Sequence, residues 1–195
     1  MTAAIIAALI VLAYLIGSIP FGLLISKWMA GKDPRQSGSG NMGATNVFRV
    51  VGKKEAILTL SADIIKGMIP IGLASFGGIE QRMLFFIGFS AILGHIFPIF
   101  LGFKGGKGVS VSFGVFLSIA PKIALSALIV WMGAFKIWHY SSAGALAAFG
   151  VLPVLALWLK PEKEFVLFSI VVSVLVYFCH RGNIVRLMRG EEKSS

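Results

Sequence analysis

Long runs of apolar residues, separated by short polar segments, dominate the sequence. Residues 4–26 carry no charged side chain over 23 positions. A helix of that length spans about 35 Å, which is enough to cross the hydrocarbon core of a bilayer. Two similar runs follow at 56–78 and 83–103, and Asp63 and Lys66 are the only charged residues in them. Each run predicts a transmembrane helix.

Beyond these runs the apolar segments are shorter, and they lie at residues 109–120, 123–135, 143–159 and 165–179. We therefore expect an all-α integral membrane protein with a bundle of about seven transmembrane helices. Pro121 and Lys122 interrupt the pattern between the fourth and fifth segments, so five crossings plus a re-entrant pair is the alternative. No repeat or linker divides the chain, which favours one membrane domain over residues 1–195.

Composition agrees with this pattern. Hydrophobic residues make up 57% of the chain and charged residues 13%, whereas about a quarter of a soluble domain is charged. A soluble enzyme and a disordered chain are therefore excluded. Cys179 is the only cysteine, so an intramolecular disulfide is excluded as well. No His, Cys, Asp and Glu cluster has metal-ligand spacing, so we expect no metal and no cofactor.

The basic residues predict the orientation. The formal net charge is +10, and Lys and Arg are enriched in cytoplasmic loops of membrane proteins. If the amino terminus lies outside, inner segments hold thirteen of the 18 Lys and Arg residues and outer segments hold four. The carboxyl terminus is then cytoplasmic, as an odd number of crossings requires.

One long polar segment, at about 31–55, follows the first span. Three glycines within six positions, Gly38, Gly40 and Gly43, free the backbone to turn its N–H groups toward one point. Arg35 and Arg49 are suited to bidentate contact with phosphate. Further side-chain donors come from Ser39, Asn41, Thr45 and Asn46. This combination predicts an anion site rather than a plain inter-helix loop.

A second glycine-rich stretch follows the third span, over residues 102–108. Three residues, not four, separate Gly102 from Gly106-Lys107, and Gly108 stands where a nucleotide-binding P-loop has a hydroxyl. The stretch is therefore no ATP site, but its glycine amides with Lys104 and Lys107 still suit an anion. Both loops are expected at the cytoplasmic face, where they would bind two phosphate-bearing substrates or one large one.

Other polar residues have two interpretations each. Asp63 and Lys66, three apart on one helix face, are a self-neutralising packing pair, or else Lys66 points at the anion site. His180 is a proton shuttle or phosphate donor, or else a helix cap. His95, inside the third span, is expected to face the interior of the bundle.

Ordered motifs across the chain resemble those of the bacterial acyl-phosphate:glycerol-3-phosphate acyltransferases, the PlsY family. The residues that carry the resemblance are Gly17-Ser18-Ile19-Pro20, Arg35, Gly38-Ser39-Gly40-Asn41-x-Gly43-Ala44-Thr45-Asn46, Asp63-x-x-Lys66-Gly67, Gly94-His95-x-x-Pro98, Lys104-Gly105-Gly106-Lys107-Gly108 and His180-x-x-Asn183-Ile184-x-Arg186-Leu187. The resemblance runs from the first span almost to the carboxyl terminus.

The resemblance also implies residue roles. The catalytic residues are expected to be Ser39, Arg49, Lys104, His180 and Asn183. Substrate binding falls on Arg35, Gly38, Gly40, Asn41, Thr45, Asn46, Gly102, Gly105, Gly106, Lys107, Gly108 and Ser142, with residues 102–108 as the glycerol 3-phosphate site. Structural roles fall on Asp63, Lys66 and Glu192, the last beside Glu191.

The implied activity is transfer of a fatty acyl group from acyl phosphate to the sn-1 hydroxyl of glycerol 3-phosphate. The products are lysophosphatidic acid and inorganic phosphate, at the first step of phospholipid synthesis in the bacterial inner membrane. We expect the lipid bilayer as the surroundings, no nucleic acid and no obligate protein partner. The alternative is a transporter or flippase of a phosphorylated small molecule, which would need polar groups that continue to the outer side.

Overall fold

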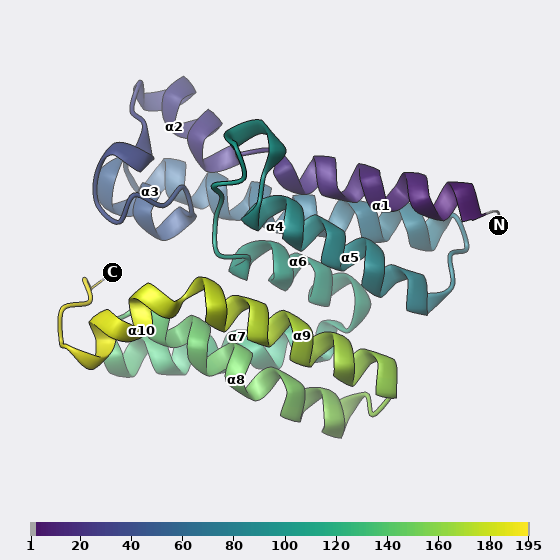
Figure 1. The fold of residues 1–195 in the computed structure, drawn as a ribbon. Helices are drawn as coiled ribbons and strands as arrows, with labels where there is room; N and C mark the ends of the chain where they lie inside the picture. The colour runs from purple at the N-terminus through teal and green to yellow at the C-terminus, as the bar shows by residue number, and fades with distance from the viewer. Residues whose placement is uncertain (1–2, 195) are drawn as a thin grey trace. The chain divides into compact units, whose positions relative to one another are not determined.

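The computed structural model describes residues 3–194 and contains helices but no strand in that range, in two compact units. The first unit ends at Ser118, and the second begins at Ile119, the last residue of α6. The first comprises α1 (Ala3–Ser18), α2 (Phe21–Ala30), η1 (Pro34–Gln36), α3 (Ala44–Val50), α4 (Lys53–Phe76), α5 (Gln81–Ile96), η2 (Ile99–Leu101) and α6 (Val109–Ile119). The second comprises α7 (Pro121–Trp138), α8 (Ser141–Leu159), α9 (Lys163–Cys179) and α10 (Arg181–Met188) (Figure 1).

The expected all-α membrane fold is confirmed, because every apolar segment of the sequence forms a helix. Within the described range, five segments are long and apolar enough to cross a bilayer: Ala3–Ala30, Lys53–Phe76, Gln81–Leu101, Pro121–Trp138 and Ser141–Leu159. A sixth is reached when α9 and α10, bent by 61° relative to each other, are taken as one. The remaining segment, α6, has 11 residues, or about 16 Å of helix, which is shorter than the hydrocarbon core.

Proline and glycine set several of the helix boundaries. Pro20 lacks an N–H and disfavours helical backbone in the residue before it, so the first apolar run is broken between α1 and α2. The αL residue Gly31 (φ +64°) ends α2, and its N–H donates to the Lys27 carbonyl over 3.1 Å. Pro121 begins α7 at a position where no N–H is needed.

Close glycine contacts pack the helices of the first unit. A Cβ at Gly67 of α4 would overlap the backbone carbonyl of Val111 in α6, and one at Gly114 of α6 would overlap the carbonyl of Ile64 in α4. Gly17 of α1 meets α5 in the same way. Small residues of this kind let helix backbones approach closely in membranes, where apolar burial alone drives little association.

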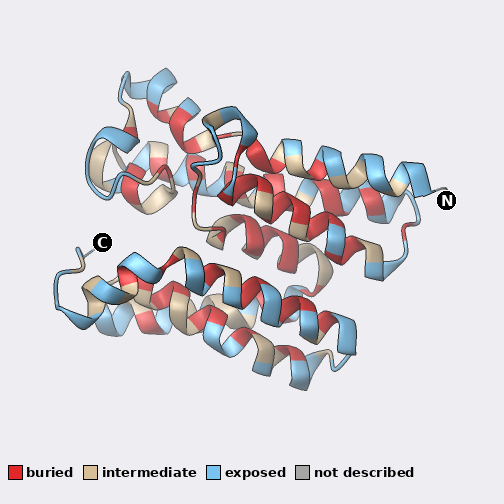
Figure 2. Cartoon of the chain, in the orientation of Figure 1, coloured by how far each residue is buried: buried red, intermediate tan, exposed pale blue. Residues whose placement is uncertain are grey.

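In the second unit, α8 packs against both α7 and α9. Its buried positions include Ala145, Ala148, Leu152 and Ala156, which follow helical spacing. The Tyr177 hydroxyl of α9 donates to the Leu146 carbonyl of α8 over 2.9 Å. The helices of both units carry a buried face and an exposed face, and many of the exposed side chains are large and apolar, as contact with lipid requires (Figure 2).

Gly67→Ala is expected to lower the free energy of unfolding by about 1–3 kcal/mol, because its methyl group would overpack the α4–α6 contact. Gly72→Ala is the matched control on the same helix, since no atom lies within 4 Å of its would-be Cβ. The control should be neutral or stabilising by up to about 1 kcal/mol. Thermal unfolding in detergent measures both, and equal stability of the two variants would contradict the packing argument.

Candidate functional site

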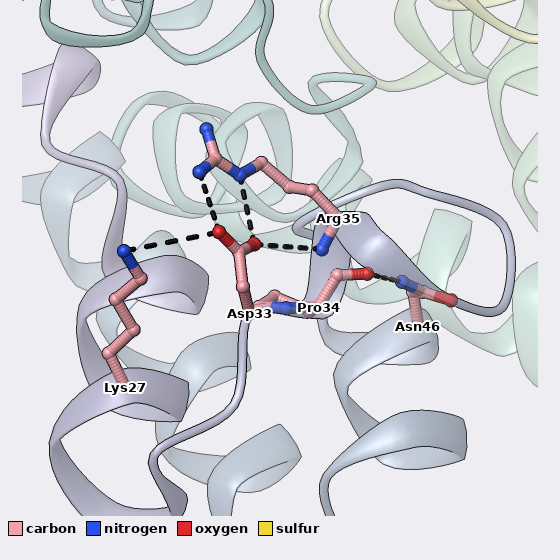
Figure 3. Close-up of polar contacts among 5 residues, drawn as sticks. All are labelled: Lys27, Asp33, Pro34, Arg35 and Asn46. Carbon is pink, nitrogen blue, oxygen red and sulfur yellow. Dashed lines mark hydrogen bonds and ion pairs between the residues drawn. The ribbon is translucent and has the colours of Figure 1, made fainter.

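In the first loop, Asp33 holds Arg35 in a bidentate ion pair (Figure 3). Asp33 Oδ1 accepts hydrogen bonds from the Arg35 backbone N–H (3.0 Å) and from Arg35 Nε (2.9 Å), and Oδ2 accepts one from Nη2 (2.6 Å). Lys27 Nζ lies 4.0 Å from Oδ2. The hydrogen bonds from the Arg35 guanidinium lower the pKa of the Asp33 carboxyl to about 2. Arg35, a candidate phosphate ligand, therefore has two of its guanidinium nitrogens paired within the loop.

The buried Asn46 side chain organises the same loop. Its Nδ2 donates to the carbonyls of Pro34 and Asn41, each over 2.7 Å, and lies 3.3 Å from the carbonyl of Ser37. Its Oδ1 accepts the backbone N–H of Ser39 over 2.8 Å. Asn46 was predicted to bind substrate, but its polar atoms contact the loop backbone. It therefore sets the conformation of the segment that carries Ser39.

The glycines of this loop adopt the backbone angles of tight turns, but the loop amides do not form the expected common anion site. Gly38 and Gly40 adopt positive φ angles of +67° and +70°. Three amides nevertheless bond within the loop. The N–H of Ser39 donates to Asn46 Oδ1, that of Gly40 to the Ser37 carbonyl, and that of Gly43 to Asn41 Oδ1. They do not turn toward one common point. What the loop exposes instead is side chains, with Ser39 exposed and Thr45 and Arg49 half-buried on α3.

The second loop caps the end of α5. The N–H groups of Gly105 and Gly106 donate to the carbonyls of Ile96 (3.1 Å) and His95 (3.0 Å). These carbonyls lie in the last turn of α5, where no intrahelical donor is available. Lys104 is exposed and Lys107 is half-buried.

The same loop leads directly into α6. Gly108 takes a positive φ of +85°, α6 begins at Val109, and Ser112 N–H donates to the Gly108 carbonyl over 2.8 Å. The amides of the first turn of α6 thus follow directly after Lys104 and Lys107. A helix amino terminus with adjacent lysines is suited to an anion.

Behind this loop lies a buried polar cluster of Asp63, Lys66 and His95. Lys66 Nζ lies 2.8 Å from Asp63 Oδ1 and donates to the Ile19 carbonyl over 2.8 Å. His95 Nδ1 lies 3.7 Å from the same Asp63 oxygen. Lys66 is thus paired with Asp63, as the packing interpretation expected. His95 lies beside this pair.

In the second unit, His180 lies at the bend between α9 and α10. The imidazole is buried, and its Nδ1 lies 2.8 Å from the Val176 carbonyl. A carbonyl oxygen can only accept, so Nδ1 carries the proton. In the neutral ring, Nε2 is then the basic nitrogen.

Glu192 joins the start of α8 to α10. Its Oε1 accepts hydrogen bonds from Asn183 Nδ2 (2.6 Å) and Ser142 Oγ (2.9 Å), and its Oε2 accepts one from Arg186 Nε (2.7 Å). Burial alone would raise the pKa of the Glu192 carboxyl, but the hydrogen bonds from Asn183, Ser142 and Arg186 hold it below its usual range. Glu191 is exposed. The carboxylate therefore fixes the side chains of Asn183 and Ser142 in the second unit.

The structure thus groups the candidates within each unit. The first unit holds Arg35, Gly38, Ser39, Gly40, Asn41, Thr45, Asn46, Arg49, Asp63, Lys66, Gly102, Lys104, Gly105, Gly106, Lys107 and Gly108. The second holds Ser142, His180, Asn183 and Glu192. Sequence reasoning put His95 inside the bundle but gave it no role in the site. Residues 3–194 contain no group of three or more His, Cys, Asp or Glu that could hold a metal.

Comparison with known proteins gives consistent matches. The family model described as glycerol-3-phosphate acyltransferase matches residues 7–190. The glycerol-3-phosphate acyltransferase of Methylococcus capsulatus is 44% identical over 185 residues, covering 94% of this chain and 93% of the relative. That of Aquifex aeolicus is 44% identical over 187 residues, covering 94% and 96%.

Two crystal structures of the integral membrane glycerol 3-phosphate acyltransferase PlsY (YgiH) are also similar. The glycerol 3-phosphate form has a TM-score of 0.92 and 39% identity, covering 97% of this chain and 95% of that one. The lysophosphatidic acid form has a TM-score of 0.89 and 38% identity, covering 97% and 94%.

Asn46→Asp is expected to lower the free energy of unfolding by about 1–3 kcal/mol, because the two donors that face loop carbonyls would become an acceptor. The amide of Ser39 should also exchange faster with solvent. Asn41→Asp is the control, since it keeps the oxygen that accepts the Gly43 N–H. Hydrogen exchange of residues 37–43 and thermal unfolding measure both, and equal effects of the two substitutions would refute the role of Asn46.

Glu192→Gln is expected to lower the free energy of unfolding by about 1–3 kcal/mol at neutral pH, because it removes the charge that three donors share. The folded-state pKa of Glu192 is depressed below its ordinary 4.5. Its contribution is therefore complete above that pH and is lost as the pH falls through the folded-state pKa. The difference between wild type and variant should shrink on acidification below about pH 4.5.

Glu191→Gln provides the control for this substitution, since Glu191 is exposed. Thermal unfolding of the three proteins between neutral and acidic pH makes the comparison. A gap between wild type and Glu192→Gln that stays constant with pH would rule out the charged network.

Proposed function

The chain belongs to the glycerol-3-phosphate acyltransferase family, and from that premise we propose that it transfers a fatty acyl group from acyl phosphate to the sn-1 hydroxyl of glycerol 3-phosphate. The products are lysophosphatidic acid and inorganic phosphate. The reaction takes place at the cytoplasmic face of the bacterial inner membrane. The observation that carries the proposal is the nearly full-length likeness to a membrane acyltransferase in its glycerol 3-phosphate form.

The phosphate of glycerol 3-phosphate binds at the glycine-rich loop, residues 102–108. Lys104 and Lys107 supply positive charge there, and the first turn of α6 supplies amides next to them. Helix amino termini bind phosphate through these amides and the helix dipole. The loop amides of Gly105 and Gly106 hold α5, so they shape the site while other groups contact the ligand.

The donor phosphate is bound by side chains of the first loop and α3. Ser39 is exposed, and Arg49 stands on α3 at the other end of the same segment. Amides of the loop are largely occupied by the loop itself. Side chains, rather than a backbone nest, therefore carry the interaction with the acyl phosphate.

The reaction is an acyl transfer between oxygens. The sn-1 hydroxyl oxygen attacks the carbonyl carbon of the acyl phosphate, the new ester bond forms, and the bond to the phosphate oxygen breaks. An acyl phosphate is a mixed anhydride with a good leaving group, so orientation contributes much of the acceleration, worth up to roughly 7–11 kcal/mol in well-oriented systems. Cationic side chains stabilise the developing oxyanion and the departing phosphate.

The hydroxyl proton leaves to the phosphate of glycerol 3-phosphate or to a protein base. His180 is the candidate base, with its Nδ1–H bound to the Val176 carbonyl and its Nε2 as the basic nitrogen. Asn183, fixed by Glu192, orients the reacting groups. Loss of turnover in a His180 variant whose KM values are unchanged would favour the protein base.

Purified protein with labelled glycerol 3-phosphate, offered acyl phosphate or acyl-CoA in parallel, is expected to form labelled lysophosphatidic acid from acyl phosphate alone. His180→Ala, purified in the same way, distinguishes the two proton acceptors: near-total loss of turnover favours the protein base, and retained turnover favours the phosphate of glycerol 3-phosphate. Product from acyl-CoA alone would overturn the donor assignment. The absence of product from either donor, together with uptake of label into protein-containing vesicles, would favour a transporter.

A further inference from the structure

The imidazole of His95 lies directly against the backbone of the glycine-rich loop. A Cβ built on Gly106 would overlap the ring, and its three nearest neighbours are all side-chain atoms of His95. On the other side of the ring, His95 Nδ1 faces Asp63 Oδ1 at 3.7 Å. The ring therefore lies between the charged pair of α4 and the loop.

Contacts within α4 and with the break between α1 and α2 hold Asp63 and Lys66 in place behind the ring. Lys66 pairs with Asp63 on α4 and also donates to the Ile19 carbonyl at the break between α1 and α2. Both side chains are 3% exposed. Because neither charge is solvated by water, each depends on these contacts, and the position of Asp63 beside His95 is fixed by them.

Packing alone gives no reason for ionisable residues here. Buried ion pairs contribute little net stability compared with apolar side chains of similar volume. Ionisable residues inside membrane spans are costly and usually serve function. What distinguishes this cluster from ordinary packing is its contact with a loop to which the proposed function gives a phosphate.

We propose that His95, held by the Asp63–Lys66 pair, is a positioning residue. It sets the position of the glycine-rich loop relative to the end of α5, and thereby the binding of glycerol 3-phosphate to that loop. The proposal rests on the proposed function for the identity of that ligand. Carbonyls of α5 fix Gly105 and Gly106 through their amides, while the imidazole fills the space beneath Gly106. That position in turn determines where Lys104, Lys107 and the first turn of α6 lie.

Removal of the ring leaves space beneath the loop, so His95→Ala should misplace the lysines and the first turn of α6. Misplacement by about 1 Å can cost about a hundredfold in rate, and displaced lysines and amides also bind the phosphate less tightly. We therefore expect the KM for glycerol 3-phosphate to rise roughly ten- to hundredfold. The KM for acyl phosphate should change by less than about threefold, because the donor is bound by the first loop and α3. The kcat should fall together with the rise in the KM for glycerol 3-phosphate, because Lys104 lies on the displaced loop and the loop orients the attacking hydroxyl.

A double-mutant cycle tests the contact itself. Gly106→Ala places a methyl group into the imidazole and should raise the same KM, and His95→Ala in the same chain removes the ring that the methyl would overlap. The double variant should therefore be less impaired than the sum of the single effects. Gly105→Ala is the matched control, because its methyl would overlap the backbone carbonyls of His95 and Ile96, which His95→Ala leaves in place.

Hydrogen exchange of residues 104–111 accompanies the kinetics and needs no substrate. His95→Ala and Gly106→Ala should each accelerate exchange, and only the Gly106 pair should show compensation. Additive effects in both cycles, or a His95→Ala protein whose loss lies in kcat with unchanged KM values, would overturn the proposal. His95→Gln keeps bulk and a donor toward Asp63, and it replaces the alanine variant if that variant does not fold.

The two proposals fail in different ways. If the wild-type protein forms no lysophosphatidic acid, the proposed function is wrong, while the exchange cycle still decides whether His95 positions the loop. If the wild-type protein is active and the Gly106 and Gly105 cycles are both additive, the positioning role is wrong and the activity stands.

Discussion

Buried backbone polar groups at the end of a helix must find partners within the protein, and this constraint governs the candidate site of the first unit. At the end of α5 the carbonyls of His95, Ile96 and Phe97 accept from Gly106 N–H, Gly105 N–H and the Tyr14 hydroxyl. The glycine-rich loop is therefore part of a helix cap. Gly105 and Gly106 are needed because the loop backbone approaches the end of α5 too closely there for side chains. The bonds at the end of α5 therefore determine where α6 starts and where the lysines of the loop lie.

The first loop obeys the same rule with different chemistry. It lies outside the spans, but a buried asparagine replaces water for its backbone, since Asn46 bonds to groups of several loop residues. Asp33 likewise fixes Arg35. In the second unit, Glu192 does this for Ser142, Asn183 and Arg186. In each case one buried or half-buried polar side chain sets the geometry of the groups around it, so the candidate residues are held before any ligand arrives.

The helices were predictable because their apolar runs are long and because Pro121 marks a break between two of them. The break at Pro20 was not predicted, since residues 4–26 were expected to form one helix. The Asp63–Lys66 pair was predictable too, since a spacing of three puts both on one helix face. The uses of the loop amides were not, because the acceptor of Gly106 N–H lies eleven positions away at His95, a contact that only the folded α5 provides. The choice of Glu192 over Glu191 likewise depends on where α8 and α10 lie, and adjacent identical residues carry no periodicity to separate them. Asn46 and Ser39 looked equally suited to an anion, and only the fold turns one inward.

These arrangements fit the proposed reaction, whose acyl donor is already activated. When the leaving group is a phosphate on a mixed anhydride, the protein gains most from holding the hydroxyl and the carbonyl in register, and little from a strong base or a metal. Rigid, internally bonded loops hold the reacting groups in that alignment, because donors that are already oriented need no reorganisation during the reaction. A mobile glycine loop would instead have to be ordered by each substrate molecule, and the ordering would weaken binding. The buried charges behind the glycine-rich loop are thus explained by the proposed chemistry: they fix a ring against Gly106, and the ring fixes the loop.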